Sequence, residues 1–151
     1  MRKKSAKITI LVLVGVLALA GVAYAYWSST GTGTGTASTG TTTGITVNQT
    51  STVTGLAPGT PAQALSGTFD NPNSGPVYVG SVSASVSGTD KTGCTASDYT
   101  ITGSPATVGV QVAAGTGVGS WSGISIAFNN KAGTNQDACK GATVTISYTS
   151  N

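Results

Sequence analysis

The sequence predicts an all-β protein, a two-sheet antiparallel sandwich of the jelly-roll or immunoglobulin-like kind, preceded by an N-terminal signal helix. Three observations predict this class. Gly, Ser and Thr dominate while Glu and His are absent, no stretch beyond residue 25 keeps apolar residues at helical spacing for long, and short Val and Ile runs alternate with polar residues between turn signals. β-branched residues fit a pleated surface, and glycine supplies the positive φ of tight turns. At 151 residues the chain has room for one compact domain.

Residues 1–25, MRKKSAKITILVLVGVLALAGVAYA, have the three parts of a signal peptide. A cationic start is followed by an apolar stretch from Ile8 and then by Ala23-Tyr24-Ala25, the small-x-small pattern that signal peptidase accepts. Cleavage after Ala25 leaves Tyr26 as the first residue. No twin arginine and no lipid-attachment cysteine precede this site, so we expect export by the general secretion pathway.

A retained membrane anchor is the alternative interpretation of the same stretch. The segment from Ile8 to Ala25 would span about 27 Å as a helix, close to the hydrocarbon core of roughly 30 Å. No Lys or Arg follows it directly as a stop-transfer signal, and the cleavage pattern favours removal. We therefore expect contact with a membrane only through an uncleaved leader.

Residues 26–44 form a Thr/Gly-rich arm or linker. From Thr30 to Thr36 threonine alternates with glycine, so an extended chain would place every Thr side chain on one face and bare backbone on the other. One interpretation is an ordered strand that lies close against another sheet. The other is a flexible spacer, which the glycine content favours because glycine loses the most entropy on ordering.

Residues 45–151 carry the pattern of the sandwich domain, with about seven or eight half-buried strands separated by turn signals. Within one of them the apolar phase changes from Val77 and Val79 to Val82, which predicts a β-bulge near Gly80. The expected strands lie in 45–54, 63–69, 76–88, 99–102, 108–112, 120–129 and 142–148.

Cys94 and Cys139 are the only two cysteines, and each lies in a turn-like setting. Two cysteines in an exported chain most simply form one disulfide. The bridge would pin the turn before the YTIT strand (99–102) to the turn before the last strand.

The charges argue against nucleic-acid binding. Four of the seven cations lie in the first seven residues. The other charged residues are three lysines against four aspartates, a net −1: Lys91, Lys131, Lys140, Asp70, Asp90, Asp98 and Asp137. A clustered basic surface is therefore absent from the sequence beyond the leader.

The residue types also argue against an enzyme, a cofactor or a metal site. Without histidine there is no Ser-His-Asp arrangement and no His-based zinc site. The four aspartates are scattered and lie beside turn-forming residues. Asp70 lies in FDNPNSG (69–75), but Pro72 stands where a calcium loop has a ligand and no acidic residue closes the loop. GTGVG (115–119) leads into a strand, so it does not form a phosphate-binding helix start.

The aromatic residues carry the one alternative binding site. Trp121 and Tyr78, with Tyr99 and Tyr148, could form a face on which sugar rings stack. A Trp beside alternating Ile residues is more often part of the core. Trp121 has the opposite phase to Ile124, however, which leaves an exposed, ligand-facing position open.

Three stretches carry a resemblance: AYAYWSST at the signal junction, GLAPG (55–59) and GTFDNPNSGPVYVGSVSASVSG (67–88). They resemble exported proteins of Gram-positive bacteria that carry the SipW-processed signal type, the TasA and camelysin group, whereas the last part is similar to actinobacterial secreted proteins of unknown function. The resemblance implies a secreted jelly-roll-like domain at the cell surface or in matrix fibres. In such fibres an N-terminal strand of one subunit completes the sheet of its neighbour, and here residues 28–44 would be that strand. A metallopeptidase activity is not implied, because His and Glu are missing.

We therefore expect a secreted cell-surface or extracellular-matrix protein with a structural or adhesive role and no catalytic activity. Its expected partners are copies of itself, in a fibre or oligomer, or cell-surface polymers. Two alternatives stay open: a secreted carbohydrate-binding module, and a single-pass anchored domain displayed on a Thr/Gly stalk.

Overall fold

The structure is a computed structural model that describes residues 29–151. The expected signal helix and its cleavage residues Ala23, Ala25 and Tyr26 lie outside the described residues. The chain divides after Thr39 into two units, and every strand of the described part falls in the second unit, residues 40–151. Residues 29–39 have no regular secondary structure and are exposed at each position.

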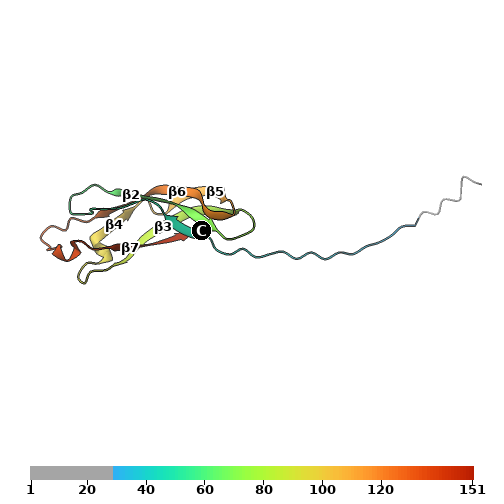
Figure 1. Ribbon diagram of the computed structural model, residues 1–151, viewed down its shortest axis with the longest axis horizontal. Helices are drawn as coiled ribbons and strands as arrows, with labels where there is room; N and C mark the ends of the chain where they lie inside the picture. Colours follow the sequence, from blue (N-terminus) through green and yellow to red (C-terminus); the bar gives the residue numbers. More distant parts are fainter. Residues whose placement is uncertain (1–28) are drawn as a thin grey trace, which may run out of the picture. The chain divides into compact units, whose positions relative to one another are not determined.

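The domain is a sandwich of two antiparallel sheets, as predicted (Figure 1). Its four-stranded sheet has the order β1-β2-β6-β4 and its three-stranded sheet the order β5-β3-β7. The strands are β1 Thr46–Gln49, β2 Gln63–Asn71, β3 Val77–Thr89, β4 Tyr99–Thr102, β5 Ala106–Val112, β6 Gly115–Phe128 and β7 Val144–Ser150. Two short 3₁₀ turns, η1 Ala96–Asp98 and η2 Asp137–Cys139, precede β4 and β7.

From β2 onward every connection crosses between the sheets, because the even-numbered strands lie in the larger sheet and the odd-numbered ones in the smaller. The third strand, β3, is the centre of the three-stranded sheet. In the immunoglobulin arrangement the sixth strand has that place. The two-sheet architecture is thus confirmed, with a strand order different from the immunoglobulin one.

The predicted irregularity at Gly80 is confirmed. The pairing of β3 with β5 changes register between Val79 and Ser81, and the partner strand carries Gly109 with a φ of 66°. The step from Val79 to Ser81 on β3 faces a step of three residues on β5, so the extra residue lies in β5. On either side of this shift Val79 and Val82 are both buried although they are three positions apart. An uninterrupted strand would place them on opposite faces.

The core lies between the two sheets and is built from the inward-facing side chains of both. In β2 the inward positions are Leu65 and Phe69, which are fully buried, as their shared phase predicts. The other buried apolar residues are Val79, Val82, Cys94, Tyr99, Ala106, Val112, Trp121, Ile124, Ile126 and Phe128. Within residues 29–151 no helix is long and apolar enough to cross a membrane.

Candidate functional site

The predicted disulfide between Cys94 and Cys139 is confirmed, and it closes one end of the domain. Cys94 lies in the loop before η1 and β4, and Cys139 ends η2 before β7. Their Cα atoms are 4.9 Å apart. The bridge therefore joins the two turns that the sequence indicated.

A buried carboxylate, that of Asp98, lies beside the disulfide with an exposed fraction of 6%. The Lys131 ammonium donates to it at 2.8 Å, the Thr95 backbone N–H at 2.9 Å and the Gln136 amide at 3.2 Å. These donors, Lys131 foremost, hold the pKa of Asp98 well below its usual range. The carboxylate is thus kept charged by interactions within the fold.

The same contacts fasten the loop after β6 to η1. The backbone N–H of Asn129 donates to the carbonyl of Asp98 at 2.8 Å, and the Gln136 amide donates to the Asn129 carbonyl at 3.0 Å. Gln136 also accepts from the backbone N–H of Lys131 at 3.0 Å. Asp98 therefore anchors a loop, and its oxygens are occupied by protein donors.

One group of metal-ligand types comes together within residues 29–151: the ligand atoms of Cys94, Asp98 and Cys139 lie within 4.8 Å of one another. Both sulfur atoms are bonded to each other, so neither is a thiolate that could bind a metal. The group is therefore a structural disulfide next to a carboxylate, and its chemistry does not fit a metal centre.

The FDNPNSG segment forms a turn built around a buried side-chain amide. Asn71 is 2% exposed, donates to the Val112 carbonyl at 2.9 Å and accepts from the Asn73 backbone N–H at 3.0 Å. The carboxylate of Asp70 accepts from the Gly117 backbone N–H at 2.7 Å, which lowers the pKa of Asp70. The contact between Asn71 and the Asn73 backbone is an Asx turn, as expected, and Asp70 ties this segment to the start of β6.

The ligand-facing position considered for Trp121 is wrong, since this side chain is 3% exposed. A register shift in β6 explains the error. The pairs Leu65–Ile124 and Gly67–Trp121 are two residues apart on β2 but three apart on β6. The extra residue, at Gly123 with a φ of 94°, turns Trp121 toward the core beside Ile124.

Tyr78 is exposed as the sugar-binding alternative requires, with 59% of its surface accessible. It lies on the outer face of the three-stranded sheet, so the structure separates it from the buried Trp121. Tyr99 is buried and Tyr148 is half-buried, and burial raises the pKa of both phenols. The four aromatic residues therefore do not form one surface.

One connection at the start of the domain was not foreseen from the sequence. The side-chain amide of Asn73 donates to the Thr43 carbonyl and accepts from the Thr43 backbone N–H, both at 2.8 Å. The side-chain amide has one donor and one acceptor for the backbone of Thr43, so it makes the two hydrogen bonds that a residue of a neighbouring strand would make. It fixes the last residues before β1 to the turn between β2 and β3.

Two clefts lie on either side of Leu56, with volumes of about 430 and 380 Å³. The larger is lined by half-buried apolar residues such as Val53, Val144 and Ile146, and the one titratable group in its lining is the phenol of Tyr99. The smaller is bordered by Lys131, Asp137 and Lys140. In the smaller cleft the Asp137 carboxylate is paired with the Lys140 ammonium at 2.8 Å.

Comparison of the chain with protein-family models, with curated proteins and with solved structures gave no match in any of the three.

Proposed function

We propose that this protein is a secreted structural unit of the bacterial cell surface or extracellular matrix that has no catalytic activity and assembles with copies of itself. The observation that carries the proposal is the Cys94–Cys139 disulfide. Disulfides persist in oxidising compartments outside the cytosol. The bridge also supports the interpretation of residues 1–25 as a signal for export.

The hydrogen bonds of the buried polar groups support a structural role. Asp98 and Asn71 are the two buried polar residues of the described chain, and both bind loops or turns of the fold. Every buried side-chain polar atom within residues 29–151 has a hydrogen-bond partner. These groups stabilise the sandwich.

Assembly is supported by the open sheets, whose edge strands are β1, β4, β5 and β7, together with the exposed arm. Edge strands present a row of backbone donors and acceptors that can pair with another chain. Residues 29–39, with their Thr/Gly alternation, are exposed throughout. By the resemblance to the TasA and camelysin group, residues 28–44 of one jelly-roll-like subunit would complete the sheet of the next.

Export is tested by intact-mass analysis of the protein from culture medium and from membranes, with and without reduction. We expect a species in the medium that starts at Tyr26 and is two hydrogens lighter than its reduced form. A full-length species in the membrane fraction would instead establish the anchored alternative, with the arm as a stalk.

Assembly is tested by sedimentation and electron microscopy of the purified secreted chain and of Thr34→Pro. Proline removes a backbone donor that strand pairing needs, so we expect this variant to assemble less than the wild type. Thr34→Ala is the matched control, because it removes the side chain and keeps the donor. A wild-type protein that stays monomeric at all concentrations contradicts the proposal.

A further inference from the structure

The outer face of the three-stranded sheet is electrically neutral and rich in hydroxyl groups. Pairing of β3 with β7 sets Ser83 opposite Thr149 and Ser85 opposite Ser147, and pairing with β5 sets Tyr78 opposite Gln111. Further outward-facing residues of these strands are Ser87, Thr107 and Thr145. No charged residue occurs in β3, β5 or β7.

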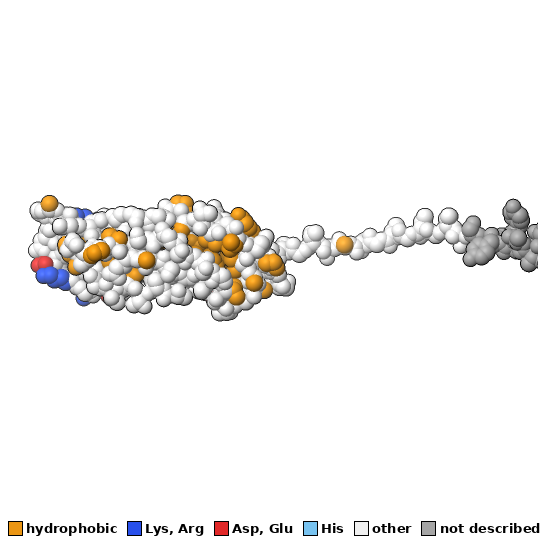
Figure 2. Space-filling view, turned by 90° about the horizontal axis from the view of Figure 1, so that it is seen from above, with side chains coloured by type: hydrophobic (Ala, Val, Ile, Leu, Met, Phe, Trp, Pro, Cys, Tyr) orange, Lys and Arg blue, Asp and Glu red, His pale blue; other side chains and the backbone are white. Residues whose placement is uncertain are grey.

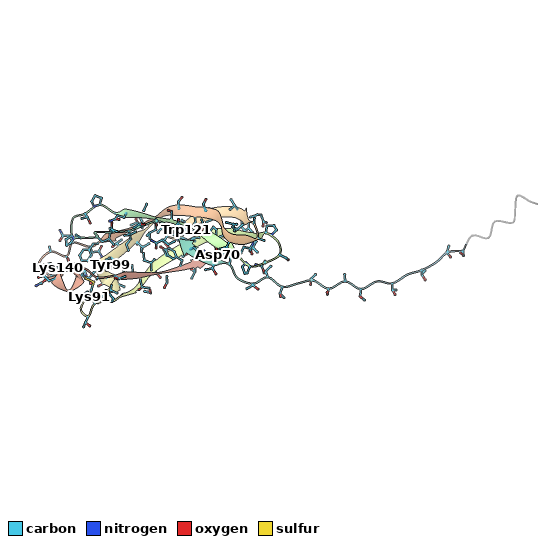
Figure 3. All side chains as sticks on the ribbon, in the orientation of Figure 1. Asp70, Lys91, Tyr99, Trp121 and Lys140 are labelled. Carbon is cyan, nitrogen blue, oxygen red and sulfur yellow. A yellow bond between two sulfur atoms is a disulfide. The ribbon has the colours of Figure 1, made fainter. Side chains whose placement is uncertain are left out.

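The charges of residues 29–151 are concentrated in loops at the end of the domain that carries the disulfide. Figure 3 shows Lys91 and Lys140 there with Tyr99, away from Trp121 and Asp70. On the face shown in Figure 2 the visible charged side chains also gather at one end. The loop charges are Asp90, Lys91, Asp98, Lys131, Asp137 and Lys140, and Asp70 in β2 is the exception. A partner of the outer face of the smaller sheet therefore meets no ionic group on these strands.

Tyr78 is the one large aromatic side chain exposed on this neutral face, with 59% of its surface accessible. Its ring lies next to two glycines. A Cβ atom at Gly80 would be 3.8 Å from the ring, and one at Gly109 would be 3.9 Å from its hydroxyl oxygen. Neither glycine carries a side chain that could cover the ring. The carbonyl and side-chain oxygens of Asn151 lie beside Gly80, at 3.3 and 3.4 Å from the same Cβ position, so the ring is bordered by polar oxygen atoms and keeps 59% of its surface accessible.

We propose that this face, centred on Tyr78, binds a neutral polysaccharide. A sugar ring has an apolar C–H side that can stack on a phenol and hydroxyl groups around its rim that can exchange hydrogen bonds with Ser and Thr. Neighbouring strands are about 4.8 Å apart, so the hydroxyl rows can contact a sugar chain along several units.

A second copy of this chain fits the face less well. The cores of protein–protein interfaces are depleted in Ser, and buried hydroxyl groups need partners to offset their desolvation. A polysaccharide supplies hydrogen-bonding groups along its whole length. The neutral, hydroxyl-rich composition thus favours the sugar polymer.

The test measures depletion of the purified secreted chain from solution by insoluble cellulose and by insoluble chitin, at low and at high salt. We expect the wild type to bind at least one of them equally at both salt concentrations, because the face has no charges to be screened. Tyr78→Ala should weaken binding about tenfold, and Tyr78→Phe should bind like the wild type because it keeps the ring.

Val110→Ala is the matched control. Within residues 29–151 Val110 is the other large exposed apolar residue, 46% accessible, and it pairs with the buried Val79, so its loss leaves the hydroxyl face intact. Absence of wild-type binding to both polysaccharides overturns the proposal, as does equal binding by Tyr78→Ala. If Tyr78→Ala differed from the wild type in sedimentation coefficient but was depleted by the polysaccharides equally, the face would bind a second copy of the chain instead. None of these results alters the mass test of export.

Discussion

The indole ring of Trp121 in β6 lies 4.9 Å from the phenol ring of Tyr148 in β7, at an angle of 50°, so an aromatic pair joins the two sheets. The indole N–H donates to the carbonyl of Asn48 at 3.2 Å, and the Tyr148 hydroxyl donates to the side chain of Gln49 at 2.7 Å. Both acceptors belong to β1. The pair therefore fills the core and also holds the first strand on the sandwich.

Trp121→Ala should lower the free energy of unfolding by about 3–5 kcal/mol, since it leaves a large cavity and the Asn48 carbonyl without its donor. Denaturant unfolding followed by circular dichroism measures the change. Trp121→Phe keeps an apolar ring and loses the N–H, so a smaller loss is expected. Equal stability of Trp121→Ala and the wild type would show that this contact does not support the fold.

Gly67→Ala should destabilise the domain by about 1–3 kcal/mol, the usual cost of overpacking. A Cβ atom at Gly67 would lie 1.7 Å from the Asn48 carbonyl oxygen and 2.9 Å from the indole nitrogen of Trp121. The strand β1 would have to move away from β2. Gly40→Ala is the control, because no atom lies within 4 Å of the added Cβ, and it should leave the melting temperature unchanged. If both variants lowered the melting temperature equally, a local clash at Gly67 would not be the cause.

Removal of the disulfide by Cys94→Ala with Cys139→Ala should lower the free energy of unfolding by about 4 kcal/mol, because the bridge joins residues 45 positions apart and restricts the unfolded chain. Urea unfolding with and without reductant measures the loss. The reduced wild type should unfold like the double variant. A double variant as stable as the oxidised wild type would refute this expectation.

Asp98→Asn should lower the melting temperature at neutral pH, with a difference from the wild type that shrinks in acid. The folded-state pKa of Asp98 is held low, first by Lys131 and then by Thr95, so the contribution is fully present above the unfolded pKa of about 3.8. It is lost as the pH falls through the folded-state pKa. The difference between the two melting temperatures should therefore begin to shrink below about pH 4 and disappear only once the pH is below the low folded-state pKa.

Thermal melts of the two proteins across this pH range test the convergence. Asp137→Asn is the control, because the ion pair of Asp137 with Lys140 is solvent-exposed and should contribute little at any pH. A constant difference between Asp98→Asn and the wild type down to strongly acidic pH would exclude the carboxylate as its cause.

Features that depend on neighbouring residues or on residue type could be predicted from the sequence. Alternation of apolar and polar positions predicted the buried Leu65 and Phe69, and the changed phase around Gly80 predicted an irregularity of pairing there. With only two cysteines, a disulfide had a single possible pairing, Cys94 with Cys139.

The tertiary structure alone decided the features that depend on pairing between distant strands. The turn of Trp121 into the core follows from the register of β6 against β2, because one extra residue in a strand reverses the face of every residue beyond it. The burial of Asp98 likewise depends on Lys131, 33 positions away, folding back onto η1. The neutral face around Tyr78 exists because β3 pairs with both β5 and β7. Local alternation of residues determines which side of one strand a residue occupies, but it does not determine which strands pair.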